Sequence, residues 1–128
     1  MDPSDIAKYK ALYIQTAREY IKELNDNLNT LMQGNETTDA VSSVHRAAHS
    51  LGSQSQVMGY ESTQVACRTI EKLFKAKKET NITITPDTYS LVTALVKEIE
   101  QSINTIETTG KELDLSESTK ILEAAIEK

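Results

Sequence analysis

Residues 44–60 read Val-His-Arg-Ala-Ala-His-Ser-Leu-Gly-Ser-Gln-Ser-Gln-Val-Met-Gly-Tyr, and the rest of the chain is interpreted around this stretch. At helical period, small and apolar residues form one narrow stripe, which comprises Val41, Val44, Ala48, Leu51, Ser55 and Met58. A polar stripe lies about 120° round the same helix and comprises His45, His49, Gly52, Ser53 and Gln56. The first stripe predicts a core-facing seam. Because the residues after His49 on the polar stripe are small, we expect its imidazole to be uncovered.

Length and composition favour one helical domain. A chain of 128 residues with 38% hydrophobic residues is long enough for a modest core. Only four glycines and two prolines provide turns, which favours long helices over many short strands. The net charge of -5 argues against a nucleic-acid surface, since phosphate binding requires concentrated lysine and arginine.

Cysteine usage and hydropathy indicate a cytoplasmic protein. Cys67 is the single cysteine, so no intramolecular disulfide is possible and a reducing compartment is favoured. No run approaches the roughly 20 apolar residues of a membrane-spanning helix, and we expect no membrane insertion.

Periodicity and capping residues predict five helices. We expect them at about residues 5–33, 38–58, 62–78, 86–109 and 117–127. The short connections predict an all-α fold, an up-down antiparallel four-helix bundle in which the fifth, short C-terminal helix packs at one side or end. We treat residues 1–128 as a single domain.

Finer expectations concern helix starts and core positions. Ser4 is the predicted N-cap of the first helix, whose apolar stripe begins with Ile6 and Tyr9. Residues 79–85 alternate like a strand but are interpreted as a loop that tucks Ile82 and Ile84 against the bundle.

The two histidines allow two chemical interpretations. His45 and His49 are four residues apart, a spacing that can chelate a metal ion, yet no further ligand lies beside them in the sequence. A nucleophilic histidine instead needs an exposed ring whose second nitrogen is held by an acceptor. The expected third helix offers such an acceptor in its polar row of Gln64, Arg68, Glu71 and Lys75. Spacing alone, however, favours Glu71 as an ordinary exposed glutamate paired with Lys75.

The stretch Arg46-Ala-Ala-His49-Ser-Leu51, followed by Gly59-Tyr60 and then by Ile70-Glu71, resembles a histidine-containing phosphotransfer (HPt) domain. The resemblance is closest to the N-terminal phosphotransfer domain of chemotaxis histidine kinases of the CheA class. Its specific part covers residues 41–74, where histidine, Gly-aromatic pair and glutamate fall in register without a gap. By this resemblance His49 is the phospho-acceptor at Nε2, and Glu71 holds the Nδ1 proton. His45 then stands where the family usually has an aromatic residue, and is expected to be a packing residue.

One position departs from the family pattern. The family carries Lys-Gly after His-Ser-Leu, and this chain has Gly52-Ser53. Because that lysine is thought to neutralise the phosphoryl group, Arg68 on the facing helix is our candidate for the missing positive charge. We expect Arg68, Gly52, Ser53, Gln56 and Arg46 to form the phosphoryl or partner surface.

The resemblance also implies the partners. A kinase catalytic domain would phosphorylate His49, and a response-regulator receiver domain of the CheY type would take the phosphoryl group onto an aspartate. We expect no catalysis by this domain alone, which would be the substrate domain of a CheA-type kinase. We expect no cofactor or metal here, since ATP and Mg²⁺ belong to the partners. The alternatives are a degenerate HPt-like adaptor that docks without carrying phosphate, and a helical adaptor with a histidine-pair metal site.

Overall fold

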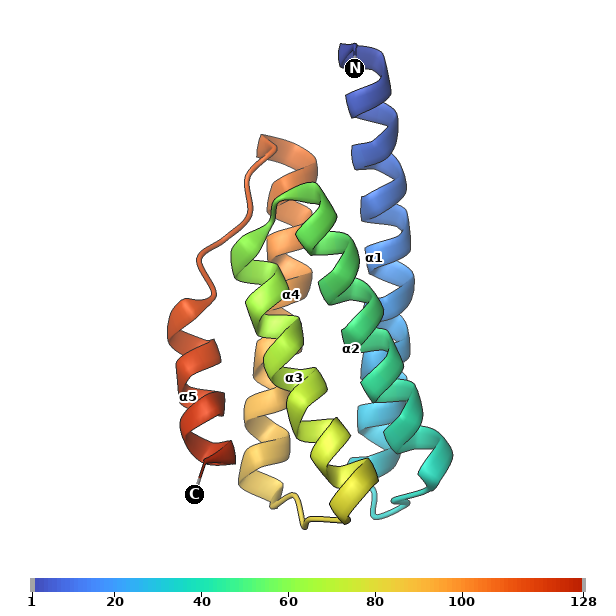
Figure 1. Cartoon of the computed structure of the whole chain (residues 1–128), viewed down its shortest axis with the longest axis vertical. Coiled ribbons are helices and arrows are strands. Elements are labelled where there is room, and N and C mark those ends of the chain that lie inside the picture. The colour runs from blue at the N-terminus through green and yellow to red at the C-terminus, as the bar shows by residue number, and fades with distance from the viewer. Residues whose placement is uncertain (1, 128) are drawn as a thin grey trace.

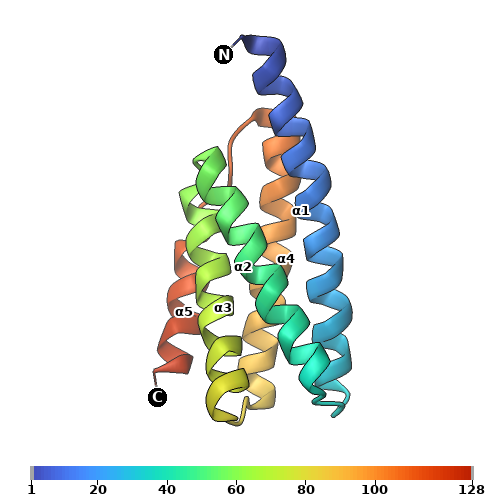
Figure 2. The same cartoon turned by 45° about the vertical axis from the view of Figure 1, so that its right-hand side comes forward.

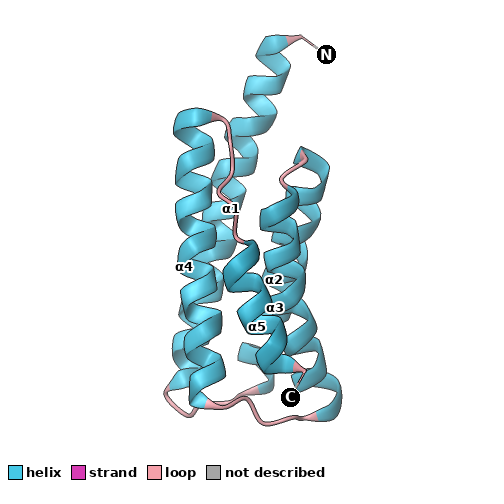
Figure 3. Cartoon of the chain, turned by 90° about the vertical axis from the view of Figure 1, so that its left-hand side faces the viewer, coloured by secondary structure: helices cyan, strands magenta, loops and turns pink. Residues whose placement is uncertain are grey.

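The computed structural model describes residues 2–127, and these fold into helices joined by short connections (Figure 1). The helices are α1 (Pro3–Met32), α2 (Thr38–Met58), α3 (Glu61–Thr80), α4 (Pro86–Thr109) and α5 (Ser116–Ile126). Within the described range no strand occurs (Figure 3). The loop expected over residues 79–85 is confirmed for residues 81–85, whereas residues 79 and 80 belong to the end of α3. The expected starts at residues 5 and 62 fall slightly inside the observed helices.

Successive helices run in opposite directions, and α1 to α4 form a ring in which each contacts the next (Figures 1 and 2). α5 packs against α3 and α4, on the side of the bundle away from α2 (Figure 3). The prediction of an all-α, up-down four-helix bundle with a short fifth helix is therefore confirmed.

Local sequence explains most helix ends. The side chain of Asp2 accepts hydrogen bonds from the backbone N–H groups of Ser4 and Asp5, at 2.8 and 3.1 Å. Asp2 is therefore the N-cap of α1, and the prediction of Ser4 is wrong because Pro3 already occupies the first helical position. Thr37 caps α2 through the N–H of Ala40, and Gly59 ends α2 in the left-handed region at φ 81°.

The N-terminus of α3 is capped from a distant part of the chain. Tyr60 precedes the helix and provides no side-chain cap. Instead, the carboxylate of Glu112 accepts from the backbone N–H groups of Ser62 and Thr63, at 3.1 and 2.8 Å, and from the Thr63 hydroxyl at 2.8 Å. A negative charge at a helix N-terminus is favoured by the helix dipole. The connection between α4 and α5 thereby fixes where α3 begins.

The core lies between the four long helices. Its largest fully buried side chains are Phe74, Ile21, Leu24, Leu28, Leu31, Leu51, Ile70, Leu95, Ile99, Ile103, Ile106 and Leu115. Ile84 is buried, as predicted for the loop that follows α3. Ile82 is 37% exposed, so the prediction that it also packs against the bundle is wrong. No helix among residues 2–127 is both long and apolar enough to cross a membrane.

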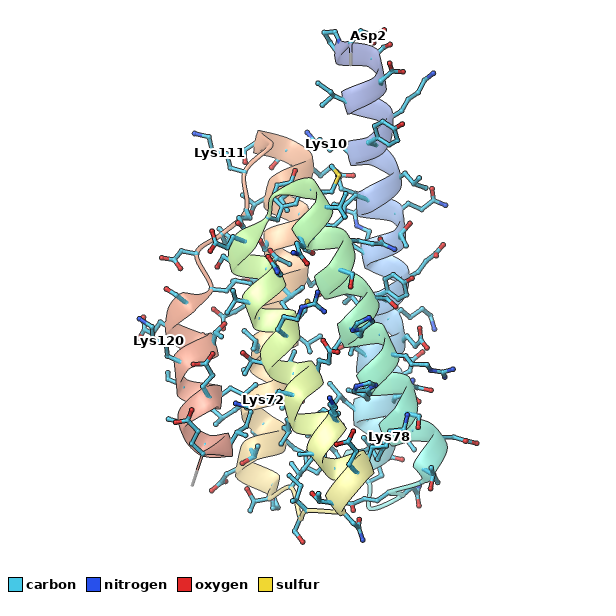
Figure 4. All side chains as sticks on the ribbon, in the orientation of Figure 1. Asp2, Lys10, Lys72, Lys78, Lys111 and Lys120 are labelled. Atoms are coloured by element: carbon cyan, nitrogen blue, oxygen red, sulfur yellow. The ribbon has the colours of Figure 1, made fainter. Side chains whose placement is uncertain are left out.

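The first turns of α1 project beyond the other helices (Figure 2). Asp2 marks the tip of this projection in Figure 4. Ile6 and Tyr9 are 54% and 53% exposed, so the expectation that they begin a core stripe is wrong. The stripe becomes buried farther along the helix, from Tyr13 on, where neighbouring helices cover it.

Candidate functional site

His49 lies on the exposed face of α2 beside α3. The opposite face of α2 is fixed in the core by Val44, Ala48 and Leu51, all fully buried. This packing turns His49 outward, and its side chain is 56% exposed. The expected uncovered imidazole is thus present in the folded chain.

The carboxylate of Glu71 meets this ring from α3. Its Oε2 lies 2.7 Å from Nδ1 of His49, and its side chain is 17% exposed. Ile70 and Phe74, on either side of Glu71 in the sequence, are fully buried and hold α3 in the register that presents Glu71 to α2. The interpretation favoured by spacing alone, an exposed glutamate paired with Lys75, is wrong.

The electrostatic environment of Glu71 determines which nitrogen of His49 carries a proton. Burial alone would raise the pKa of Glu71, but hydrogen bonds from His49 and Arg68 outweigh it and lower this pKa below its ordinary value. Glu71 is therefore ionised at neutral pH, and an ionised carboxylate only accepts hydrogen bonds. The proton of the neutral imidazole consequently lies on Nδ1, and Nε2 presents a lone pair.

Arg68 extends from α3 across α2 beside this pair. Its Nη1 donates to Oε1 of Glu71 at 3.0 Å. Its Nη2 lies 3.4 Å from Oγ of Ser53 and 3.3 Å from Oε1 of Gln56. Nη1 is also 3.5 Å from Nδ1 of His49, but a protonated Nδ1 cannot accept, so this approach is not a hydrogen bond.

The other expected surface residues separate into two groups. Ser53 and Gln56 contact Arg68 as described, and Gln56 is exposed. Gly52 is buried and offers no exposed surface to a partner, contrary to expectation. Arg46 is exposed, and its guanidinium contacts Ser43 on its own helix at 3.4 Å rather than His49 or Glu71.

His45 lies one turn before His49 and is largely covered. Its side chain is 21% exposed, and both ring nitrogens are buried without a hydrogen-bond partner among the described residues. Within the same range, no group of three or more His, Cys, Asp or Glu side chains is arranged to hold a metal ion. Residues 2–127 therefore provide no third protein ligand arranged beside the histidine pair.

A groove next to this site was not predicted. It lies between the N-terminal half of α1 and the end of α2, and Ser53 both lines this groove and contacts Arg68. Its apolar lining includes Leu12, which is 57% exposed, and Val57, which is 85% exposed. Tyr9 and Tyr13 of α1 also line the groove, so an apolar stripe that begins in the first turns of the chain was a partial signal for it.

Comparisons with known proteins agree with this arrangement. Two curated relatives, each called "Chemotaxis protein CheA", come from Listeria monocytogenes and Listeria innocua. Each is 24% identical over 116 residues, which is 90% of this chain but only 19% of the relative. A solved structure, "Solution Structure of Histidine Phosphotransfer Domain of CheA", matches with a TM-score of 0.82 and 23% identity over 91% of this chain and 90% of that one.

The likeness to the solved structure shows a common fold. A family model, "Hpt domain", matches residues 8–109, a range that includes His49, Arg68 and Glu71. The chain therefore belongs to the Hpt domain family.

Proposed function

We propose that this domain carries a phosphoryl group on Nε2 of His49, and that Glu71 holds the proton on Nδ1. The observation that supports this most is the 2.7 Å contact between Nδ1 of His49 and Oε2 of Glu71 on a ring that remains 56% exposed. A carboxylate holds one nitrogen, which leaves the other nitrogen of this exposed ring as the proposed nucleophile.

The forward step is transfer from ATP bound to a kinase domain. The lone pair of Nε2 attacks the γ-phosphorus, the Nε2–P bond forms, and the bond from phosphorus to the β,γ-bridging oxygen breaks. ADP leaves with that electron pair. The ring gains positive charge, which the ionised Glu71 stabilises across the Nδ1–H hydrogen bond.

The onward step reverses the role of Nε2. A carboxylate oxygen of a receiver-domain aspartate attacks the phosphorus, and the Nε2–P bond breaks. The electron pair returns to Nε2, and Nδ1 keeps its proton throughout. ATP and Mg²⁺ would be supplied by the kinase and receiver partners. The domain itself has only to present and orient His49 and to release the phosphoryl group.

The partner surface is proposed to be the face of α2 that carries His49. Gln56 and the exposed part of Arg68 offer polar contacts beside the ring, and the groove around Leu12 and Val57 offers an apolar contact next to them. An apolar patch adjoining a few polar groups is typical of interfaces that form and separate.

The biological setting is proposed from the relatives. Both are named as chemotaxis proteins, and this chain spans about a fifth of their length. We therefore propose that the domain serves a chemotaxis phosphorelay in the cytoplasm, as the phosphotransfer domain of a CheA-type kinase. Its partners would be the kinase ATP-binding domain and a CheY-like receiver.

The test is incubation of the domain with a CheA kinase core that lacks its own phosphotransfer domain, together with ATP and Mg²⁺. With ATP that carries a radioactive γ-phosphate, we expect label to appear on the unchanged domain, called the parent below. The variant His49→Gln should take up no label. Glu71→Gln should be phosphorylated at least about tenfold more slowly, by analogy with the carboxylate partners of metal-binding histidines, whose loss typically costs 10–100-fold. A parent that stays unlabelled, or a His49→Gln variant that labels like the parent, would contradict the proposal.

A second candidate is a docking domain that binds a receiver without carrying phosphate. The observation in its favour is Gly52, which stands where the family has its phosphoryl-neutralising lysine. This candidate predicts receiver binding that is equal for the parent and His49→Gln, with no label on either. Labelling of the parent at His49 would exclude it.

A further inference from the structure

Gly52 lies in the middle of α2, one turn beyond His49, where the helix packs against α3. A Cβ atom added at this glycine would lie 3.2 Å from Cβ of Cys67 and 3.3 Å from Nη1 of Arg68. Non-bonded carbon atoms pack best at about 3.5–4.0 Å, so even an alanine would press on both neighbours. Gly52 is not among the glycines with positive φ, so its backbone conformation does not require glycine. The close approach of Cys67 and Arg68 is what leaves no room for a larger side chain.

The guanidinium of Arg68 occupies that space. Arg68 starts on α3, crosses over Gly52 and reaches the backbone oxygen of His49, which lies 3.5 Å from Nη1. Its side chain remains 34% exposed. A positive charge therefore lies above the position that a side chain three residues after His49 would fill.

We propose that Gly52 and Arg68 are a matched pair: glycine clears the surface of α2 so that Arg68 can supply, from α3, the positive charge for the phosphoryl group on His49. This inference rests on the proposed role of His49 as phospho-acceptor. It assigns the neutralising function to a residue on the opposite helix from the family lysine.

The contacts of Arg68 suit this role because its two terminal nitrogens are held unequally. Nη1 is anchored to Oε1 of Glu71 at 3.0 Å. Nη2 has only long contacts, 3.4 Å to Ser53 and 3.3 Å to Gln56, which are beyond the usual range of good N–H···O hydrogen bonds. These weak contacts can be exchanged for phosphoryl oxygens, with which a guanidinium forms short, charge-assisted bonds.

Other cations are less well placed. Lys111 and Lys120 lie on the α4–α5 connection and on α5, on the side of the bundle away from α2 (Figure 4). Arg46 is on α2 but contacts Ser43 instead. Within residues 2–127, Arg68 is the cation with a recorded contact to the His49 ring, its Nη1 lying 3.5 Å from Nδ1.

The first experiment measures how fast potassium phosphoramidate, a small donor that releases ammonia, phosphorylates His49. Its use separates the chemistry from partner docking. Arg68→Gln should slow labelling at least about tenfold, the effect of losing one hydrogen bond to a charged group. Arg68→Lys should recover part of the rate, whereas Arg18→Gln, an arginine paired with Glu107 on the far edge of the bundle, should match the parent. An Arg68→Gln variant that labels as fast as the parent would overturn the proposal while leaving His49 as the acceptor.

The second experiment moves the charge back to α2. Gly52→Lys in the parent should slow labelling, since the new side chain and Arg68 would compete for one space. The double variant Gly52→Lys/Arg68→Gln should label several-fold faster than Arg68→Gln alone. A role of Arg68 confined to positioning Glu71 predicts no such rescue, because a lysine introduced on α2 would not restore the contact that Arg68 makes with Glu71 from α3. A folded double variant without rescue would contradict the matched pair.

A third measurement does not depend on whether lysine is accommodated. Gly52→Ala is made in the parent and in Arg68→Gln, and the urea midpoint of each is compared. The contact with Cys67 and the helix propensity of alanine are common to both backgrounds and cancel. Gly52→Ala should lower the midpoint more in the parent than in Arg68→Gln, and equal shifts in the two backgrounds would show that the residues are independent.

Discussion

Nε2 of His45 lies 4.0 Å from Oε2 of Glu71, the same carboxylate oxygen that accepts the hydrogen bond from His49. The closer histidine takes this acceptor, and His45 keeps two buried ring nitrogens without partners among the described residues. A buried polar group left without a hydrogen bond costs about 1–3 kcal/mol. We therefore expect an apolar aromatic ring at this position to be tolerated.

The variant His45→Phe should therefore be as stable as the parent or more stable by about 1 kcal/mol, since it removes unpaired nitrogens and keeps an aromatic ring. Urea unfolding followed by circular dichroism measures this difference. Labelling at His49 should persist. A loss of more than about 1 kcal/mol would show that the nitrogens of His45 do have partners in solution.

The lowered pKa of Glu71 predicts a pH-dependent stability. A carboxyl group whose pKa is lower in the folded than in the unfolded chain stabilises the fold above its unfolded pKa of about 4.3. That contribution is lost as the pH falls through the lower, folded pKa. Glu71→Gln should therefore reduce the unfolding free energy by about 1–2 kcal/mol at pH 7, and the difference from the parent should shrink below about pH 4.

The control for this comparison is Glu100→Gln, an exposed glutamate on α4. It should follow the parent at every pH. A difference between Glu71→Gln and the parent that stays constant down to about pH 3, or grows there, would contradict the assignment of Glu71 as an ionised, paired carboxylate.

Glu112 should be a stabilising residue although it lies in a connection. Glu112→Ala removes the acceptor for the N–H groups of Ser62 and Thr63, and loss of an N-cap costs about 0.5–2 kcal/mol. Hydrogen exchange of the first turn of α3 should accelerate more than that of α1. If the amides of residues 62 and 63 stay as protected as in the parent, the cap is not formed by Glu112.

The thiol of Cys67 should be inert in the folded domain. It is fully buried, and this burial raises its pKa to about 12. Reaction with an alkylating reagent at about pH 8 should be about two orders of magnitude slower than in urea, because the thiolate forms only when the fold opens. Rapid alkylation of the native domain would indicate that α2 and α3 separate readily at Gly52.

The sequence predicted those features that depend on neighbouring residues. Helical periodicity located the long helices, and the expected starts at residues 38 and 86 are those of α2 and α4. Periodicity could not reveal that α1 extends past its neighbours, and so Ile6 and Tyr9 were wrongly assigned to the core. The cap from Glu112 to Thr63 spans 49 positions, and no local pattern predicts such a contact.

In the candidate site, too, some features could be predicted from the sequence and others depend on how the helices pack. The register of His49 and Glu71 followed from a family resemblance, whereas spacing alone favoured a Glu71–Lys75 pair. The Gly52–Arg68 relationship depends on how closely α2 approaches α3, a distance that packing sets and residue spacing does not. The sequence therefore offers Arg68 as a candidate for the missing charge, but the space that Gly52 leaves for this arginine is visible only in the folded chain.

The most direct test of the central claim is to label the domain with a kinase core and ATP and to locate the phosphoryl group by ¹⁵N and ³¹P NMR. Our account predicts a single phosphohistidine at residue 49 with phosphorus bonded to Nε2 and a proton retained on Nδ1. Phosphorus on Nδ1 of His49, or on His45, would contradict it.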